Sequence, residues 1–490
     1  MSLNLCALCA SVRKKSKKIQ NRYPLPWTRS VRYNIESKLF EEEQFMSKHI
    51  SNEALNNYRG MFFYNKLNHM RMRAVVKNGL EAASEDHTEA IENPMIFSIE
   101  LETGKITEQK STGRCWLFAA LNTMRLEIMR KLNLETFELS QNYMMFFDKL
   151  EKANFFLENI IETAGEPLDS RLLFHLLAGP VFDGGQWDMF CALVDKYGCV
   201  PKSIMPETFH SSNTARLNSL LTLKLREDAY VLRKAVSEGA SVDKLRDMKD
   251  NMLADIYCML CICLGEPPRD MKFNFEYRDK DKVFHADYGI KPREFYEKYV
   301  GQTLDDYVSI INAPTDDKPY YKTYTVAYLG NVVGGREIKY LNLPIEELKW
   351  LAIAQLKDQT PVWFGCDVGQ MLRRDAGIMS MHNYDYEGIT GIRFKLNKAQ
   401  RLDYSESLMT HAMVFLGVNL ENDKPTRWKV ENSWGKKSGQ QGYYIMTDEW
   451  FDEFNYQVVV NKKYLSAAQL EAYEQDPITL KPWDPMGSLA

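Results

Sequence analysis

The sequence predicts an α+β fold, with helices dominating its first half and strands its second. Apolar residues recur at helical spacing from Leu117 to Leu132, and again from Asn213 to Leu264, a stretch almost free of Gly and Pro. From Phe273 onward, short apolar or aromatic segments bounded by turn residues are typical of strands. A chain of 490 residues with 45% hydrophobic content can bury a large core, in about two to four structural units.

The N-terminal segment, residues 1–36, is strongly basic. It carries eight Lys or Arg residues and no acidic residue before Glu36. We interpret it as a flexible basic extension, with a mitochondrial transit segment as the alternative. Its apolar run is short and precedes the basic residues, which is the reverse of a secretory signal, so a cytoplasmic protein is expected.

Membrane and nucleic-acid partners are not expected. No apolar stretch reaches the length of a membrane span. A formal net charge of −4 gives the molecule no general attraction to polyanions, so nucleic-acid binding would need a local basic patch.

The first half is predicted to hold two segments after the leader. Residues 37–212 form an N-terminal segment and a first subdomain, helical from Glu36 to about Lys77 and extended from Ile96 to Ile106. Residues 213–268 form a helical insertion, and Gly239 marks a hairpin between its helices.

The second half is predicted to be a β-rich subdomain over residues 269–465, followed by a C-terminal arm over residues 466–490. A helix is expected from Ile345 to Lys357, running into a buried strand. The expected strands are Tyr321 to Tyr328, Pro361 to Val368, His411 to Asn419 and Trp428 to Glu431.

Nine cysteines, an odd number in a long chain without a secretory signal, favour free thiols in a reducing compartment. Cys258, Cys261 and Cys263 lie close together, but the run around them is apolar and has no nearby His. Buried core thiols explain them better than metal ligands do. We therefore expect neither a metal nor another cofactor.

Cys115 is the candidate nucleophile, because it opens a helix that is apolar on one side. The unpaired N–H groups of a helix N-terminus favour the thiolate that attacks a carbonyl. Gln109, six residues earlier, and the backbone N–H of Cys115 are the candidate donors to the resulting oxyanion. A cysteine at such a place is more often a packing residue, so its companions must decide.

Those companions are His411, Asn432 and Trp434. A histidine facing Cys115 would take the thiol proton and later protonate the departing amine. Asn432 can orient that imidazole without adding charge, and Trp434 can shield their hydrogen bond from water. The remaining histidines are expected to be structural or at the surface: His49, His69, His87, His175, His210, His285 and His382.

Taken together, Gln109, Gly113 to Trp116, His411-Ala412 and Asn432 to Gly435 resemble the ordered motifs of papain-like cysteine peptidases. The resemblance implies a helical subdomain carrying Cys115, an antiparallel sheet or barrel carrying His411 and Asn432, and a cleft between them. Further motifs narrow the resemblance to bleomycin hydrolases and bacterial aminopeptidases C over nearly everything after residue 36. These motifs are Lys110 to Trp116, Asp183 to Trp187, Tyr277 to Lys282, Glu406 to Met413 and Trp483 to Ala490.

Two departures from secreted papain-like enzymes stand out. Thr112 occupies the position where those enzymes carry a disulfide-forming cysteine, which suits an intracellular protein. His411 lies 296 residues after Cys115, about twice the usual gap of that family, and the helical insertion accounts for the difference.

The narrower resemblance implies an aminopeptidase that acts on peptide substrates and assembles as a homohexamer. Members of that group place their own C-terminus in the substrate cleft, so the Ala490 carboxylate would pair with the α-ammonium of a substrate. Gly184 and Gly185 resemble the glycine pair that binds the substrate backbone as an added strand; without the resemblance they would be interpreted as a turn. Asp183 and Asp484 are acidic residues near the cleft without an assigned role.

Two alternatives stay open. An endopeptidase or acyl transferase on the same scaffold would follow if the C-terminal arm did not occupy the cleft. A binding or scaffold protein that performs no chemistry is the alternative of a different class, and retention of all four site residues argues against it.

Overall fold

The computed structural model describes residues 49–489, so the basic leader up to residue 36 and the terminal Ala490 lie outside the described residues. The chain divides into two compact units, Met1–Ala83 and Ser84–Ala490. In the described part of the first unit, α3 (Asn52–Tyr64) begins after Ser51, whose hydroxyl accepts the N–H of Ala54. Helix α4 (Lys66–Asn78) ends at Gly79, and neither helix has a buried residue.

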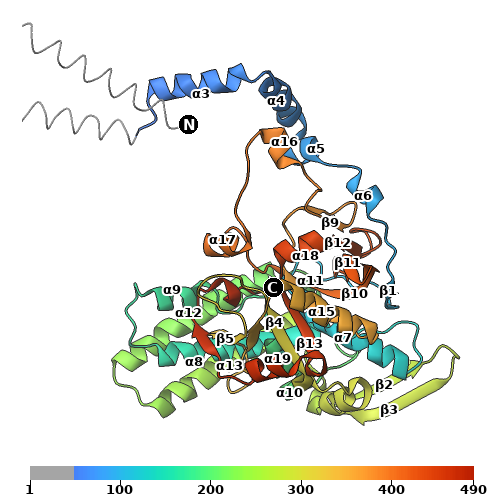
Figure 1. Cartoon of the computed structure of the whole chain (residues 1–490). Helices are drawn as coiled ribbons and strands as arrows, with labels where there is room; N and C mark the ends of the chain where they lie inside the picture. The colour runs from blue at the N-terminus through green and yellow to red at the C-terminus, as the bar shows by residue number, and fades with distance from the viewer. Residues whose placement is uncertain (1–48, 490) are drawn as a thin grey trace, which may run out of the picture. The chain divides into compact units, whose positions relative to one another are not determined.

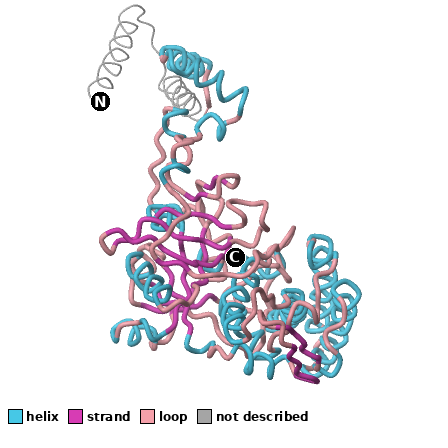
Figure 2. Tube along the Cα trace, turned by 90° about the vertical axis from the view of Figure 1, so that its right-hand side faces the viewer, coloured by secondary structure: helices cyan, strands magenta, loops and turns pink. Residues whose placement is uncertain are grey.

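The second unit confirms the predicted α+β class, with a strand-rich part beside a helix-rich part (Figure 2). Its major helices before residue 265 are α7 (Cys115–Lys131), α8 (Gln141–Glu162), α9 (Arg171–Ala178), α10 (Trp187–Tyr197), α12 (Ala215–Ser237) and α13 (Val242–Leu264). Figure 1 shows α8, α12 and α13 packed side by side. The shorter helices before residue 265 are α6 (Glu89–Glu92), α11 (Phe209–Ser212) and α5 (Leu80–Ser84), which spans the boundary between the two units.

Residues 213–268, the predicted helical insertion, contain the two long helices α12 and α13. Gly239 lies between them with a φ of +82°, a backbone conformation that glycine adopts without strain. Ser241 caps α13 by accepting the N–H of Lys244. The buried stripe of α12 includes Leu217, Leu221 and Leu225, which follow one another at four-residue spacing.

The expectation for the cysteine cluster of α13 was wrong in part. Cys258 is exposed, and Cys261 and Cys263 are only half-buried. The buried stripe of the helix instead consists of Met252, Ile256, Leu260 and Leu264. At four-residue spacing these side chains share one face, which leaves the thiols on the flank and outer side of the helix.

The large sheet has twelve strands in the order β14-β5-β6-β4-β13-β7-β10-β11-β12-β9-β8, with β1 paired to β10 outside that path. The strands are β1 (Ile99–Glu100), β4 (Tyr307–Ile311), β5 (Lys322–Val326), β6 (Tyr340–Asn342), β7 (Val362–Cys366), β8 (Leu372–Arg373), β9 (Ile378–Met379), β10 (His411–Glu421), β11 (Lys424–Glu431), β12 (Tyr443–Thr447), β13 (Asn455–Asn461) and β14 (Ile478–Leu480). All four predicted strands are present. The extended segment expected from Ile96 to Ile106 is a strand only at Ile99–Glu100.

The middle of the sheet is buried and positions β10. His411 pairs with Cys366 of β7, and Val414 pairs with Glu431 of β11, both in antiparallel register. Phe364 and Phe415 stack at 3.7 Å between ring centres. Helix α7 packs on β10, and the Trp363 indole N–H donates to the Trp116 carbonyl at 3.2 Å.

The remaining elements complete the second unit. Strands β2 (Phe273–Arg278) and β3 (Phe284–Ile290) form a separate antiparallel hairpin, so the first part of the predicted β-rich segment does not join the large sheet. Helix α15 (Ile345–Lys357) has the predicted bounds and leads into β7. The shorter helices are α14 (Pro292–Phe295), α16 (Tyr386–Thr390), α17 (Lys398–Asp403), α18 (Asp448–Phe454) and α19 (Ala467–Tyr473).

Within residues 49–489, no helix combines the length and apolar character that a bilayer crossing requires.

Candidate active site

Cys115 is the first residue of α7 and is 2% exposed. No side chain caps this end of the helix, and its first turn contains no acidic residue. The sulfur accepts N–H groups from Trp116 and from Ala412, the residue after His411. The thiol therefore sits where backbone dipoles favour a thiolate, against the start of β10.

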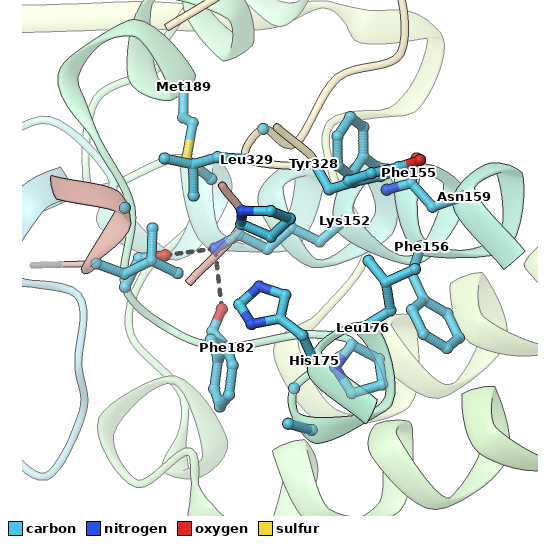
Figure 3. A pocket seen from close by; sticks show the side chains of 18 of the residues that line it. Lys152, Phe155, Phe156, Asn159, His175, Leu176, Phe182, Met189, Tyr328 and Leu329 are labelled. Carbon is cyan, nitrogen blue, oxygen red and sulfur yellow. Dashed lines mark hydrogen bonds between the residues drawn. The ribbon is translucent and has the colours of Figure 1, made fainter. Parts of the chain in front are cut away.

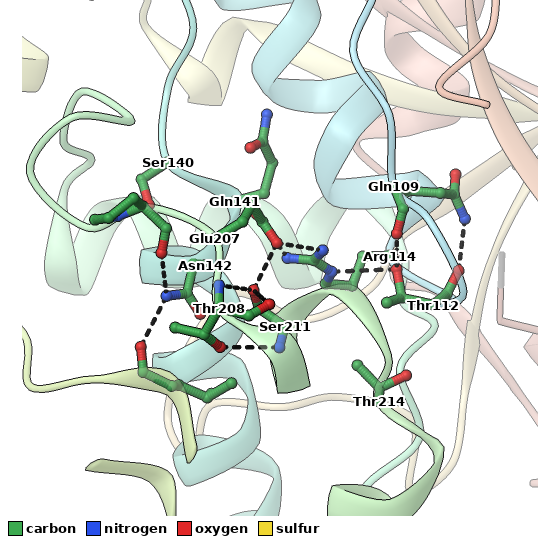
Figure 4. Close-up of polar contacts among 12 residues, drawn as sticks. Gln109, Thr112, Arg114, Ser140, Gln141, Asn142, Glu207, Thr208, Ser211 and Thr214 are labelled. Atoms are coloured by element: carbon green, nitrogen blue, oxygen red, sulfur yellow. Dashed lines mark hydrogen bonds and ion pairs between the residues drawn. The ribbon is translucent and has the colours of Figure 1, made fainter. Parts of the chain in front are cut away.

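Arg114 anchors the loop before this helix (Figure 4). Its buried guanidinium makes two parallel contacts with the carboxylate of Glu207, at 3.1 and 2.8 Å. Its Nε also donates to the hydroxyl of Thr112 at 3.2 Å. A bidentate arginine–carboxylate pair fixes direction as well as distance, so it holds the backbone that leads into Cys115.

His411 is the first residue of β10, and Asn432 directly follows the neighbouring antiparallel strand β11. The imidazole Nε2 donates to the Asn432 side-chain oxygen at 3.0 Å, and the same oxygen accepts the N–H of Ser433 at 2.7 Å. This leaves Nδ1 as the imidazole nitrogen available to a reacting group. The Trp434 ring centre is 4.9 Å from that of His411, at an interplanar angle of 33°, so the indole covers the imidazole.

Gln109 joins the cysteine loop to the end of β11. Its side-chain oxygen accepts the Ser433 hydroxyl at 2.6 Å, and its backbone N–H donates to the Ser433 carbonyl at 2.7 Å. The amide nitrogen donates one hydrogen to the Thr112 carbonyl at 2.6 Å. One N–H of the amide therefore remains for an oxyanion.

Burial disfavours the thiolate of Cys115 and the imidazolium of His411, each considered alone. It raises the pKa of the Cys115 thiol to about 11, although N–H groups from Ala412 and Trp116 oppose this. It lowers the pKa of His411 to about 4, against the bond to Asn432. A lone charge is therefore costly at either residue.

Asp183, unassigned from the sequence, is a hub of buried polar contacts. Its carboxylate accepts the Gly113 N–H at 3.0 Å and the Lys149 ammonium at 2.7 Å, and its carbonyl accepts the Trp116 indole N–H at 2.7 Å. Burial raises the pKa of Asp183, but Lys149 and the hydrogen bonds outweigh it and hold that pKa well below its usual range. Asp183 thus binds Gly113 and Trp116, which lie on either side of Cys115 in the sequence.

Lys149 and Lys152 are buried neighbours of the site that sequence reasoning missed. Lys152 donates to the Gly184 carbonyl at 2.7 Å and to Asp148 at the same distance. The available signal was the charged run from Asp148 to Lys152 inside a helix that is otherwise rich in Phe and Met. Such charges in a buried helix must find partners across the fold.

Gly184 and Gly185 lie beside the Cys115 helix. A Cβ on Gly185 would approach the Trp116 ring to 2.6 Å, so the close packing excludes a side chain there. Gly184 lines a pocket of about 570 Å³ whose wall includes Lys152, His175 and Leu176 (Figure 3).

The C-terminal arm enters this pocket. Gly487, Ser488 and Leu489 line it. The Ser488 carbonyl accepts the side-chain N–H of Gln186 at 2.5 Å, and its hydroxyl donates to the carbonyl of Met409 at 2.7 Å. Asp484, the other unassigned acid, pairs with Lys318 at 3.0 Å and accepts the N–H of Met486, which orients the arm.

The geometry resembles a papain-like thiol site: a cysteine at a helix N-terminus lies against Ala412 of β10, and the preceding His411 hydrogen-bonds to Asn432. In agreement, the model of the Peptidase C1-like family matches residues 49–487, and the chain belongs to this family.

Its relatives include aminopeptidase C of Listeria monocytogenes, 51% identical over 91% of this chain and 100% of that protein. Aminopeptidase C of Streptococcus thermophilus is 52% identical over 85% and 94% of the two chains. Human bleomycin hydrolase is 46% identical over 80% of this chain and 88% of its own length. Within the family, the chain is a cysteine aminopeptidase of the bleomycin hydrolase type.

A solved structure has the same fold. The crystal structure of PepW from Lactobacillus rhamnosis HN001 superposes with a TM-score of 0.89 at 52% identity, covering 91% of this chain and all of that one. The papain-like fold expected from the sequence motifs is therefore confirmed.

Proposed function

We propose that Cys115 is the nucleophile of this aminopeptidase, with His411 as its proton carrier and Asn432 as the residue that orients the imidazole. The observation that carries this proposal is the pair of contacts around β10: the Ala412 N–H reaches the Cys115 sulfur, and His411 Nε2 lies 3.0 Å from Asn432. Both halves of the site thus meet at one strand end.

The reaction follows from these positions. The thiol proton passes to Nδ1 of His411, and the thiolate attacks the carbonyl of the first peptide bond. The Cys115 N–H and the remaining N–H of Gln109 stabilise the oxyanion. The imidazolium then gives its proton to the departing amine, which leaves an acyl-thioester; His411 next takes a proton from water, whose oxygen replaces the sulfur and releases the N-terminal residue.

The requirement for a free N-terminus is assigned to the C-terminal arm. Ser488 is held by Gln186 and by Met409, two residues before His411, and Leu489 lines the pocket beside Gly184. Ala490 follows directly in the chain, so its carboxylate is the candidate partner of the substrate α-ammonium. Gly184 and Gly185 would bind the substrate backbone next to it, and Trp434 would contact the departing portion.

Deletion of residues 487–490 tests this assignment. The truncated enzyme should cleave N-acetylated peptides, which the full chain should leave intact. Unchanged specificity would contradict the assignment and favour another explanation for the aminopeptidase activity. Extension of the chain by one or two alanines is the matched experiment, because it should obstruct the cleft and lower kcat/KM for all peptides.

Hydrolysis of the amide in bleomycin is a second proposed activity. It is supported by the 46% identity to human bleomycin hydrolase. Purified protein should convert bleomycin to its carboxylate product, and a Cys115→Ser variant should not.

Homohexamer assembly, a cytoplasmic location and the division at residues 36, 212, 268 and 465 are likewise proposals. Native mass spectrometry tests the hexamer. Limited proteolysis tests the boundaries, since cleavage is expected in exposed connecting segments. The alternative of a scaffold without chemistry predicts no selective alkylation at Cys115.

A further inference from the structure

An arginine lies against the indole that covers His411. The guanidinium carbon of Arg374 is 3.9 Å from the centre of the Trp434 ring, and that ring is centred 4.9 Å from the imidazole. The guanidinium is therefore less than about 9 Å from the imidazole. Arg374 is exposed and Trp434 is half-buried, so this cation reaches solvent beside the reacting groups.

The charge of Arg374 has no acidic partner among residues 49–489, since none of their ion pairs includes it. Its neighbour Arg373 provides a contrast, because that guanidinium is buried and pairs with Glu85 at 2.9 Å. Tyr444 is a neighbour of Arg374, and its neutral hydroxyl leaves the positive charge uncompensated.

The surroundings of Arg374 are positive on balance. Lys436 and Lys437, both exposed, follow Trp434 in a loop that donates the Gly439 N–H to the Arg374 carbonyl. Glu108, which lies close to Gly435, is already paired with Lys110 at 2.6 Å. Asp375 is the one acidic residue adjacent in sequence. The positive charge reaches the active site, where Arg374 contributes to the lowered pKa of His411.

The position of Arg374 assigns it to the departing part of the substrate. His411 must lie within hydrogen-bond reach of the amine that it protonates. The proposed function assigns the retained residue to Gly184 and the C-terminal arm, which line a pocket that does not include Arg374 or Trp434. We propose that Arg374 binds a carboxylate on the departing peptide, an inference that rests on the proposed function.

The reach of a peptide defines the substrate class. Each extended residue spans about 3.3–3.6 Å, so a departing dipeptide carries its terminal carboxylate on the order of 7 Å from the departing nitrogen. A glutamate as first departing residue brings its side chain to a similar distance. The preferred substrates are therefore tripeptides with a free C-terminus, or longer peptides with an acidic second residue. A guanidinium suits either, because its planar donors match a carboxylate.

The test compares the wild-type enzyme with Arg374→Gln on matched substrates. Ala-Ala-Ala against its C-terminal amide measures recognition of the terminal carboxylate. Ala-Glu-Ala-amide against Ala-Gln-Ala-amide measures recognition of the side chain. Alanine coumarylamide, whose departing group has no carboxylate, reports the chemistry alone, and its turnover by the wild-type enzyme tests the proposed function separately.

Arg374→Gln should lower kcat/KM about five- to tenfold more for the carboxylate member of one or both pairs than for its neutral counterpart, and the coumarylamide measures separately any effect on the chemistry at His411. The wild-type preference should also weaken as salt rises. Arg374→Glu should create a preference for Ala-Lys-Ala-amide. Arg393→Gln, an exposed arginine elsewhere, is the control and should change nothing. Equal losses on all substrates would make Arg374 a support for Trp434, and no loss would make it a surface residue; either result overturns the proposal.

Discussion

The imidazole Nε2 of His411 lies 3.0 Å from the side-chain oxygen of Asn432, while the Asn432 amide nitrogen is buried without a hydrogen-bond partner in the described structure. The oxygen thus accepts two hydrogen bonds, from His411 and from Ser433, and the nitrogen donates none within the described residues. Asn432 therefore acts on the imidazole through one atom, which makes its contribution testable by substitutions that keep or remove that atom.

Asn432→Ala should lower kcat about ten- to a hundredfold, because the imidazole loses its orientation. Asn432→Asp keeps the acceptor and adds a negative charge, which favours the imidazolium and raises the pKa of His411. The alkaline limb of the kcat/KM profile should then move to higher pH. A profile that stays in place would contradict direct contact between the two side chains in the working enzyme.

Alkylation by iodoacetamide should reveal the coupling between Cys115 and His411. In the wild-type enzyme, Cys115 should react at neutral pH faster than the other thiols, because the thiolate forms with the imidazolium. In His411→Ala no internal acceptor remains, and burial raises the Cys115 pKa to about 11. Its alkylation rate at pH 7 should fall by roughly a hundredfold or more and recover only as the pH approaches that value. Cys258, which is exposed, provides an internal reference in the same sample.

Asp183→Asn should destabilise the protein, because it leaves the Lys149 ammonium buried without its carboxylate. Breaking such a pair typically costs about 3–5 kcal/mol, measurable as a shift of the urea midpoint at pH 7. The folded pKa of Asp183 is depressed, so its stabilisation is present above the ordinary carboxyl pKa and is lost as the pH falls below it. The difference between wild type and variant should therefore shrink in acid. Asp169→Asn, at an exposed position, should show neither effect.

Gly185→Ala should impair both stability and catalysis. The added methyl group would lie 2.6 Å from the Trp116 ring, and relieving that overlap should cost about 1–3 kcal/mol and shift the start of α7. Since Cys115 directly precedes Trp116 in the chain, kcat/KM should fall together with the melting temperature. Gly165→Ala is the matched control, because nothing lies within 4 Å of its added methyl group. Equal behaviour of the two variants would rule out the close packing at Gly185.

The helices were the easiest elements to predict. Helix α15 has the expected bounds, and α12 and α13 fill the expected insertion, because apolar spacing and capping residues are local properties of the chain. The extended segment from Ile96 to Ile106 was less predictable. Only Ile99 and Glu100 pair with β10, since strand formation depends on a distant partner as much as on the segment itself.

By itself, the sequence determined which residue types could perform thiol chemistry, their order along the chain, and the family to which they belong. Only the tertiary structure decided that Asp183 secures Cys115, that Cys258 faces solvent, and that Arg374 lies on Trp434. The reason is physical: helix periodicity and motifs depend on near neighbours, whereas the partners of a buried charge or a stacked cation come from other elements, tens of residues away. Those partners are selected when the elements pack together and water is removed from between them.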